Sequence, residues 1–155
     1  MSIDKLRTAL EANLQAELAG KRAQCALLED QEAAIRANDS RALAAAGEKL
    51  HRELERAVDR ARARAQLLAG LATSLDVADA RVHTVAAALG ESGARLVELR
   101  GDLREICADS LARGRRLSVL VRAHGALIEE ALGRFLAPDP SGAPLGRGSL
   151  VDARA

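Results

Sequence analysis

The chain contains almost no aromatic side chains: among its 155 residues there is one Phe, and there is no Trp or Tyr. The β-branched and aromatic residues that favour strands are scarce, whereas the helix formers Ala, Leu, Glu and Arg are abundant. Ala is small, so Ala-rich helix seams bury little apolar area each, and such a core is only marginally stabilising alone. The composition is typical of long helices and coiled coils, and it favours a chain that a partner stabilises.

An excess of one charge, a long apolar run and paired cysteines are also lacking. The formal net charge is +1, so no overall field attracts nucleic acid or anionic lipid. There is no run of about 18 apolar residues for a transmembrane helix, and no signal peptide is recognisable. Cys25 and Cys107 form no disulfide framework and suit a reducing compartment. We expect a cytoplasmic protein without membrane insertion.

The spacing of apolar residues predicts a long helical hairpin. Ser2 can cap a first helix that ends near Ala37, and the capping residues 38–40 mark a tight turn. Two heptad series follow in the second helix: Leu43, Leu50, Ala57, Arg64 and Leu71, and Gly47, Leu54, Ala61, Leu68 and Leu75. We expect this seam to pair with the first helix in antiparallel orientation, and Leu54→Glu to unfold the hairpin by burying a charge.

A short helix and a third long helix complete the prediction. Asp76 or Asp79 is expected to cap the short helix, which the glycines of residues 90–93 end. The third helix then runs to about Leu136. The predicted fold class is all-α, a coiled-coil-like three-helix bundle in one domain over residues 1–136. Three prolines and several glycines predict a flexible tail over 137–155.

The end of the third helix carries more apolar surface than one seam requires. Its apolar stripe fails around Ser110 to Arg116 and resumes in a shifted phase. One interpretation is a core helix, and the other is a surface that faces a partner. The predicted partner-binding residues are Leu117, Leu120, Val121, Leu127, Ile128, Leu132 and Phe135.

Motifs for catalysis and metal binding are incomplete. Glu48 and His51 have the Glu-x-x-His spacing of di-iron bundles, but those sites need a second such pair and two further Glu. No phosphate-binding loop, nucleophile elbow or paired Cys-x-x-Cys is present. We interpret Cys25 and Cys107 as small buried hydrophobes. We therefore expect no enzyme activity, no metal and no cofactor.

Four arginines of the second helix raise the question of nucleic acid. They are spaced by four residues: Arg52, Arg56, Arg60 and Arg64. Such a strip can track phosphates, but acidic residues are interleaved with it and no aromatic side chains accompany it for stacking. A solvated face of salt bridges is the preferred interpretation, with no nucleic-acid partner.

Residues 27–39, leading into Leu43, Leu50 and Leu54, resemble the helix–turn–helix of the FlgN-like flagellar export chaperones. The resemblance extends over most of residues 3–136. It implies a cytoplasmic type III secretion chaperone without a cofactor. Such a chaperone binds the helical terminal segment of flagellar hook-associated proteins, which form the hook–filament junction. It prevents their premature assembly and aids their delivery to an export-gate component. The alternative is a self-associating coiled-coil adaptor, a homodimer paired through the second helix.

Overall fold

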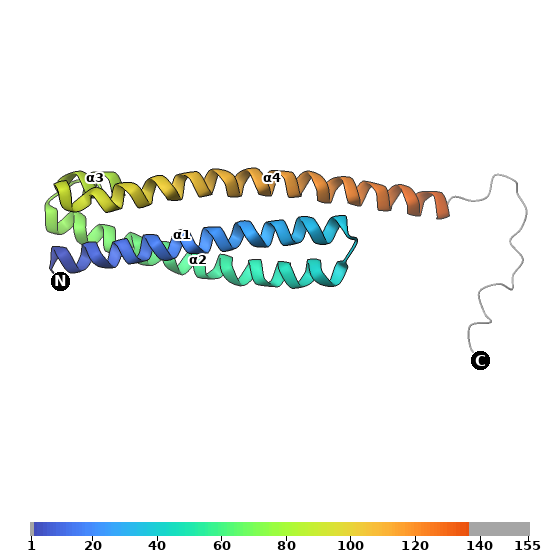
Figure 1. The fold of residues 1–155 in the computed structure, drawn as a ribbon, viewed down its shortest axis with the longest axis horizontal. Coiled ribbons are helices and arrows are strands. Elements are labelled where there is room, and N and C mark those ends of the chain that lie inside the picture. The colour runs from blue at the N-terminus through green and yellow to red at the C-terminus, as the bar shows by residue number, and fades with distance from the viewer. Residues whose placement is uncertain (1, 137–155) are drawn as a thin grey trace, which may run out of the picture. The chain divides into compact units, whose positions relative to one another are not determined.

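The computed structural model describes residues 2–136, the last two by their backbone alone, and within this range the predicted all-α fold is confirmed. The elements are α1 (Ile3–Arg36), α2 (Ser40–Leu75), α3 (Val82–Ala88), a 3-10 turn η1 (Gly90–Gly93) and α4 (Ala94–Leu136) (Figure 1). The expected tail over 137–155 lies outside the described residues.

The ends of the hairpin helices use the capping residues predicted from the sequence. The Ser2 hydroxyl accepts a hydrogen bond from the Lys5 N–H at 3.4 Å, which satisfies one free donor at the start of α1. Asp39 does the same for α2, accepting from the Ala42 N–H at 2.9 Å. Asn38 takes a left-handed conformation with φ of 53°. The turn between the two helices is therefore as short as expected.

The predicted cap of the short helix is wrong. Helix α2 continues to Leu75, so Asp76 lies directly after it and ends it in a left-handed conformation with φ of 52°. Asp79 lies two residues before Arg81, the N-cap position of α3, and pairs with that arginine at 3.1 Å. Arg81 itself precedes α3 and makes no side-chain cap hydrogen bond.

Gly93 allows α3 and the start of α4 to lie close together. A Cβ atom at this position would lie 2.8 Å from the Cα of Ala86, nearer than atoms can pack without a shift of backbone. Gly93 and Ala86 are both buried. Only glycine fits here, so the chain folds from α3 through η1 directly into α4.

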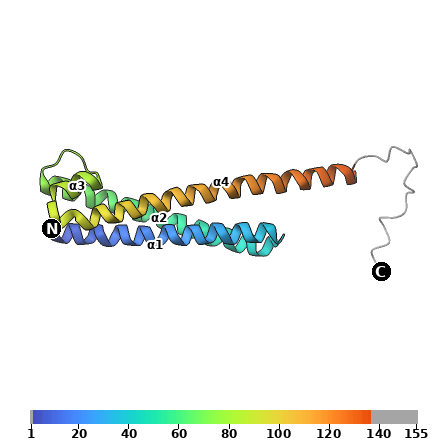
Figure 2. The ribbon, with the colours of Figure 1, turned by 45° about the horizontal axis from the view of Figure 1, so that its top comes forward.

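The chain divides into two compact units, residues 1–121 and 122–155. In the first unit, α1 and α2 are antiparallel and lie side by side, and α4 starts beside α3 (Figures 1 and 2). Leucines of α1 and α2 share one core with Val85 of α3 and with Leu96 and Leu99 of α4. The fully buried large side chains are Leu10, Leu14, Leu71, Val85, Leu96 and Leu99. This core holds the three long helices together over residues 1–121.

The seam of α2 differs from the predicted heptads in its middle. Leu54 is 47% exposed, whereas the preceding residue, Glu53, is 8% exposed. Glu53 pairs with Arg60 at 2.6 Å, and Gly20 of α1 leaves the space that these side chains occupy. The contact is therefore rotated by one residue from the expected position. A charge at Leu54 would remain in water, so the expectation that Leu54→Glu buries a charge in the seam is wrong.

A layer of polar contacts crosses the hairpin around this point. Arg64 of α2 pairs with Glu17 of α1, and the Asn13 amide donates to the backbone carbonyl of Arg60 at 3.2 Å. We call Asn13, Glu17, Glu53, Arg60 and Arg64 the polar layer. Buried ion pairs add little net stability, but losing one partner leaves a buried charge unpaired. The polar layer therefore specifies one register between α1 and α2.

Candidate partner-binding surface

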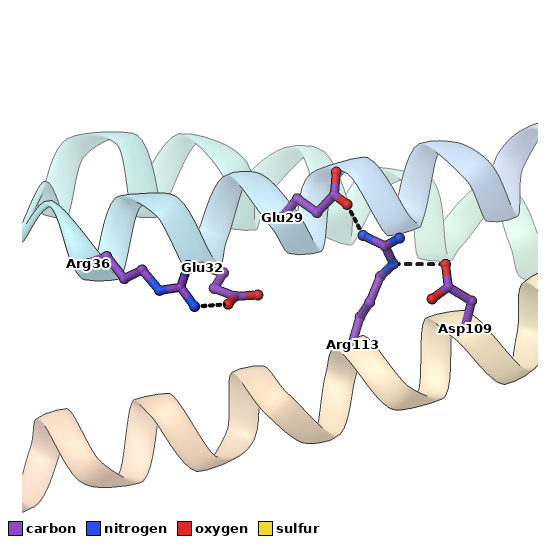
Figure 3. Close-up of polar contacts among 5 residues, drawn as sticks. All are labelled: Glu29, Glu32, Arg36, Asp109 and Arg113. Atoms are coloured by element: carbon purple, nitrogen blue, oxygen red, sulfur yellow. Dashed lines mark hydrogen bonds and ion pairs between the residues drawn. The ribbon is translucent and has the colours of Figure 1, made fainter.

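The contact between α4 and α1 includes an ion pair that the sequence does not reveal. Arg113 of α4 points toward α1, where its guanidinium pairs with Glu29 (Figure 3). The same guanidinium bonds to Asp109, one turn earlier on α4, at 2.8 Å. Arg113 lies in the stretch where the apolar stripe of the third helix fails. Polar contacts here take the place of the leucines that pack earlier in α4.

Large apolar side chains become exposed on α4 around and after this ion pair. Within the first unit Leu111 is 63%, Val119 is 62% and Val121 is 52% exposed. Leu117 and Leu120 of the predicted surface are half-buried. Exposed apolar residues are ordinary when they occur singly, but a succession on one helix indicates an interaction surface.

The second unit carries the remaining predicted residues. Leu127 is 64%, Ile128 is 49% and Leu132 is 53% exposed. None of the side chains described between residues 122 and 134 is buried. The side chain of Phe135 lies outside the described residues. This part of α4 is therefore helical without covering its own apolar side chains.

Two glycines weaken this end of α4 as a helix. A Cβ atom at Gly125 or Gly133 would meet nothing within 4 Å, so no close approach requires glycine there. Each glycine costs a helix about 1 kcal/mol relative to Ala. Isolated helices of about 15 residues are marginal in water even with better sequences. The segment would gain from a partner that covers it.

Sequence reasoning named the exposed Val121, Leu127, Ile128 and Leu132, left Val119 out of the predicted surface, and missed Leu111. That residue lies in the stretch from Ser110 to Arg116, where polar residues interrupt the apolar spacing. The sequence did contain a signal for its exposure, because a leucine in a polar stretch of a helix lies on no apolar stripe that could pack against another helix. Its exposure of 63% places it among the most exposed large apolar side chains of the described residues.

The four arginines of α2 do not form one exposed strip. Each step of four residues rotates a helical position by about 40°, so Arg52 and Arg64 point about 120° apart. Arg52 and Arg56 are exposed, whereas Arg60 and Arg64 turn into the hairpin and pair with acidic residues of the polar layer. Half of the strip therefore serves the fold, and two of its four arginines remain exposed.

The groups considered for chemistry are dispersed. His51 is exposed and lies 3.5 Å from Glu55, one turn later, rather than against Glu48. Cys25 is buried as predicted, while Cys107 is half-buried. Over residues 2–136 no three His, Cys, Asp or Glu side chains gather closely enough to hold a metal ion. The most extensive feature left for function is the apolar surface of α4.

No family model, no curated protein and no solved structure matches the chain. Within the described part of the chain, no helix has an apolar stretch long enough to cross a membrane.

Proposed function

We propose that the protein is a cytoplasmic export chaperone that binds the helical terminal segment of flagellar hook-associated proteins. The observation that carries the proposal is the exposure of the apolar side chains at the end of α4: Leu127, Ile128 and Leu132. An amphipathic helix recognises such a surface through apolar residues at i, i+3, i+4 and i+7. The identity of the partner comes from the resemblance to the FlgN-like chaperones.

The energetics suit a carrier that must release its cargo. The exposed side chains are aliphatic, so they offer modest apolar area without the aromatic anchors that dominate tight interfaces. Full burial of one such side chain contributes about 1.5 to 3 kcal/mol. The conformational entropy lost when the end of α4 becomes ordered offsets part of that gain in binding free energy. Binding therefore prevents premature assembly while it remains reversible, and an export-gate component then receives the cargo.

The test uses a synthetic peptide with the helical terminal sequence of a hook–filament junction protein. Isothermal titration calorimetry is expected to give saturable binding, and circular dichroism a gain in helicity. Ile128→Glu with Leu132→Glu should weaken binding more than tenfold and leave the dichroism of the free protein unchanged. Both residues are exposed, at 49% and 53%, so the new charges stay in water. Leu120 is half-buried and is a less suitable position.

Val97 provides the matched control on the same helix. It is 54% exposed and lies near the start of α4, before the surface under test. Val97→Glu is compared with Ile128→Glu alone, because it adds the same single charge to an equally exposed aliphatic position and should leave the affinity unchanged. Equal losses at Val97 and at Ile128 would indicate a general effect of charge and would contradict the proposed surface. Absence of binding at high micromolar peptide would contradict the function.

A self-associating coiled-coil adaptor is the second candidate. Leu54 and Val58, spaced by one turn on α2, are 47% and 51% exposed and offer a small apolar patch to a second copy. The rest of the α2 seam is occupied by α1 within the chain, with Leu71 fully buried. Light scattering distinguishes the candidates. A monomer mass that does not change with concentration supports the chaperone, and a dimer mass supports the adaptor.

A further inference from the structure

A cavity of about 520 Å³ opens in the first unit where the hairpin, α3 and α4 meet. Its volume is within the range of ligand pockets. Its apolar lining comes from all four helices: Leu14, Leu68, Val82 and Leu103. These residues belong to the core cluster or pack against it, so the floor of the cavity is continuous with the core.

The rim of the cavity is cationic. Four arginines line it: Arg64, Arg81, Arg100 and Arg104. Arg64 is paired with Glu17, and Arg81 with Asp79. Arg100 and Arg104 have no hydrogen-bond or ion-pair partner among residues 2–136. Two positive charges are therefore left without a counter-charge beside an apolar floor.

The other side of α4 has the opposite character. A neighbouring cavity between α1 and α4 is lined by Asp102, Glu105 and Asp109 with a single arginine, Arg22. No Asp or Glu lines the cationic cavity. The α4 side chains that line the two cavities are thus acidic in one and basic in the other. The uncompensated charge at Arg100 and Arg104 is a property of this cavity rather than of the whole helix.

We propose that the cationic cavity binds an acidic amphipathic helical segment of a partner protein. Arg100 and Arg104 are one helical turn apart, about 6 Å. Two carboxylates spaced by four residues on a partner helix have the same separation, so each can receive a charge-assisted hydrogen bond. A leucine between those carboxylates covers the apolar floor. This site is separate from the α4 surface of the proposed function and does not depend on it.

The apolar floor of the cavity disfavours the binding of other anions. Inorganic phosphate or a nucleic-acid backbone would cover Leu14, Leu68 and Leu103 with a strongly hydrated group and gain nothing from them. Nucleic acid would in addition lack aromatic side chains on which to stack its bases, since the chain has one Phe and no Trp or Tyr. A segment that combines carboxylates with aliphatic side chains matches both parts of the cavity.

The two free cysteines give a direct readout of occupancy. Cys107 lines the cavity and is half-buried, whereas Cys25 is buried at 6% exposure. The probe is a fluorescent synthetic helix of Leu, Ala and Glu, with two Glu four residues apart and Leu between them. It should bind saturably by fluorescence anisotropy. It should also slow the alkylation of Cys107 by iodoacetamide several-fold, as followed by mass spectrometry.

Charge reversal tests the two arginines. The double variant Arg100→Glu, Arg104→Glu is expected to lower the affinity for the probe at least tenfold. Its circular dichroism should not change, because Arg104 is exposed and Arg100 half-buried. Arg41→Glu with Arg52→Glu makes the same change in net charge at two exposed positions of α2 and should leave binding intact. Replacing both Glu of the probe by Gln should abolish binding.

Several results would overturn the proposal. One is a probe that binds the two double variants equally well, or that binds without protecting Cys107. Another is a Gln probe that binds as tightly as the Glu probe. A third is decanoate protecting Cys107 while the peptide does not, which would assign the cavity to an acyl carboxylate. Ile128→Glu with Leu132→Glu should leave probe binding unchanged, so failure here and failure of the proposed function are distinguishable.

Discussion

Gly20 determines how α1 and α2 meet in the middle of the hairpin. A Cβ atom there would lie 2.6 Å from the Glu53 carboxylate and would also collide with the Arg60 guanidinium. Glycine lowers the helix propensity of α1, but its missing side chain is what admits the ion pair. A sequence pattern records only the lower propensity, because the ion pair comes from the other helix.

Gly20→Ala should therefore destabilise the protein, despite a gain in helix propensity of about 1 kcal/mol. Displacing Arg60 leaves the buried Glu53 with Arg56 alone, at 3.6 Å, and breaking a buried ion pair costs about 3 kcal/mol or more. We expect the free energy of unfolding, measured in urea, to fall by about 2 kcal/mol.

The control for Gly20→Ala is a background in which the obstructing side chains are gone. With Glu53→Ala and Arg60→Ala, the same Gly20→Ala substitution should become stabilising by up to about 1 kcal/mol. A destabilising effect of similar size in both backgrounds would show that Gly20 matters for another reason.

Leu54 and Leu71 belong to the same predicted seam, but only Leu71 is buried. Leu54 is 47% exposed and Leu71 is 0% exposed. We expect Leu54→Glu to change the free energy of unfolding by less than about 1 kcal/mol. Leu71→Ala should cost about 2 to 5 kcal/mol, because it empties a closed part of the core. Urea unfolding of both variants checks the difference, and a large loss at Leu54 would place it in the core after all.

At the scale of elements, the helices and their caps could be predicted from sequence more fully than their contacts. The periodicity and the capping residues at Ser2 and Asp39 depend on local spacing, and local spacing is visible in one chain. The rotation of the α2 seam from Leu54 to Glu53 depends on a glycine of another helix. The cavity around Arg100 depends on four segments at once. Such features exist only after the helices have packed.

The last part of α4 is where helix propensity should affect binding. Gly125→Ala with Gly133→Ala should raise helicity, because both positions are open, with nothing within 4 Å of a new Cβ atom. Ordering the segment beforehand removes part of the cost of binding. We expect affinity for the junction-protein peptide to rise up to about tenfold by calorimetry.

Gly101 is the matched control in the packed part of the same helix. It too is open, so Gly101→Ala should raise the free energy of unfolding by up to about 1 kcal/mol without changing the affinity. Higher helicity from the Gly125 and Gly133 substitutions with unchanged or weaker binding would contradict the preorganisation argument.

At the scale of the whole molecule, total charge conceals the arrangement of charge. The formal net charge of +1 predicts no global attraction to nucleic acid. It does not reveal that arginines of α4 line one cavity of the first unit and carboxylates of α4 line another. Composition is therefore a sound guide to the fold class and a poor one to local sites.

The polar layer has a consequence for the order of events at the ribosome. All of its ion pairs join residues between Glu17 and Arg64, which are synthesised well before α4. Chains fold from the N-terminus during translation, so these contacts can form as soon as α2 has been made. We expect the nascent chain to settle the alignment of its first two helices before the apolar end of α4 has left the exit tunnel.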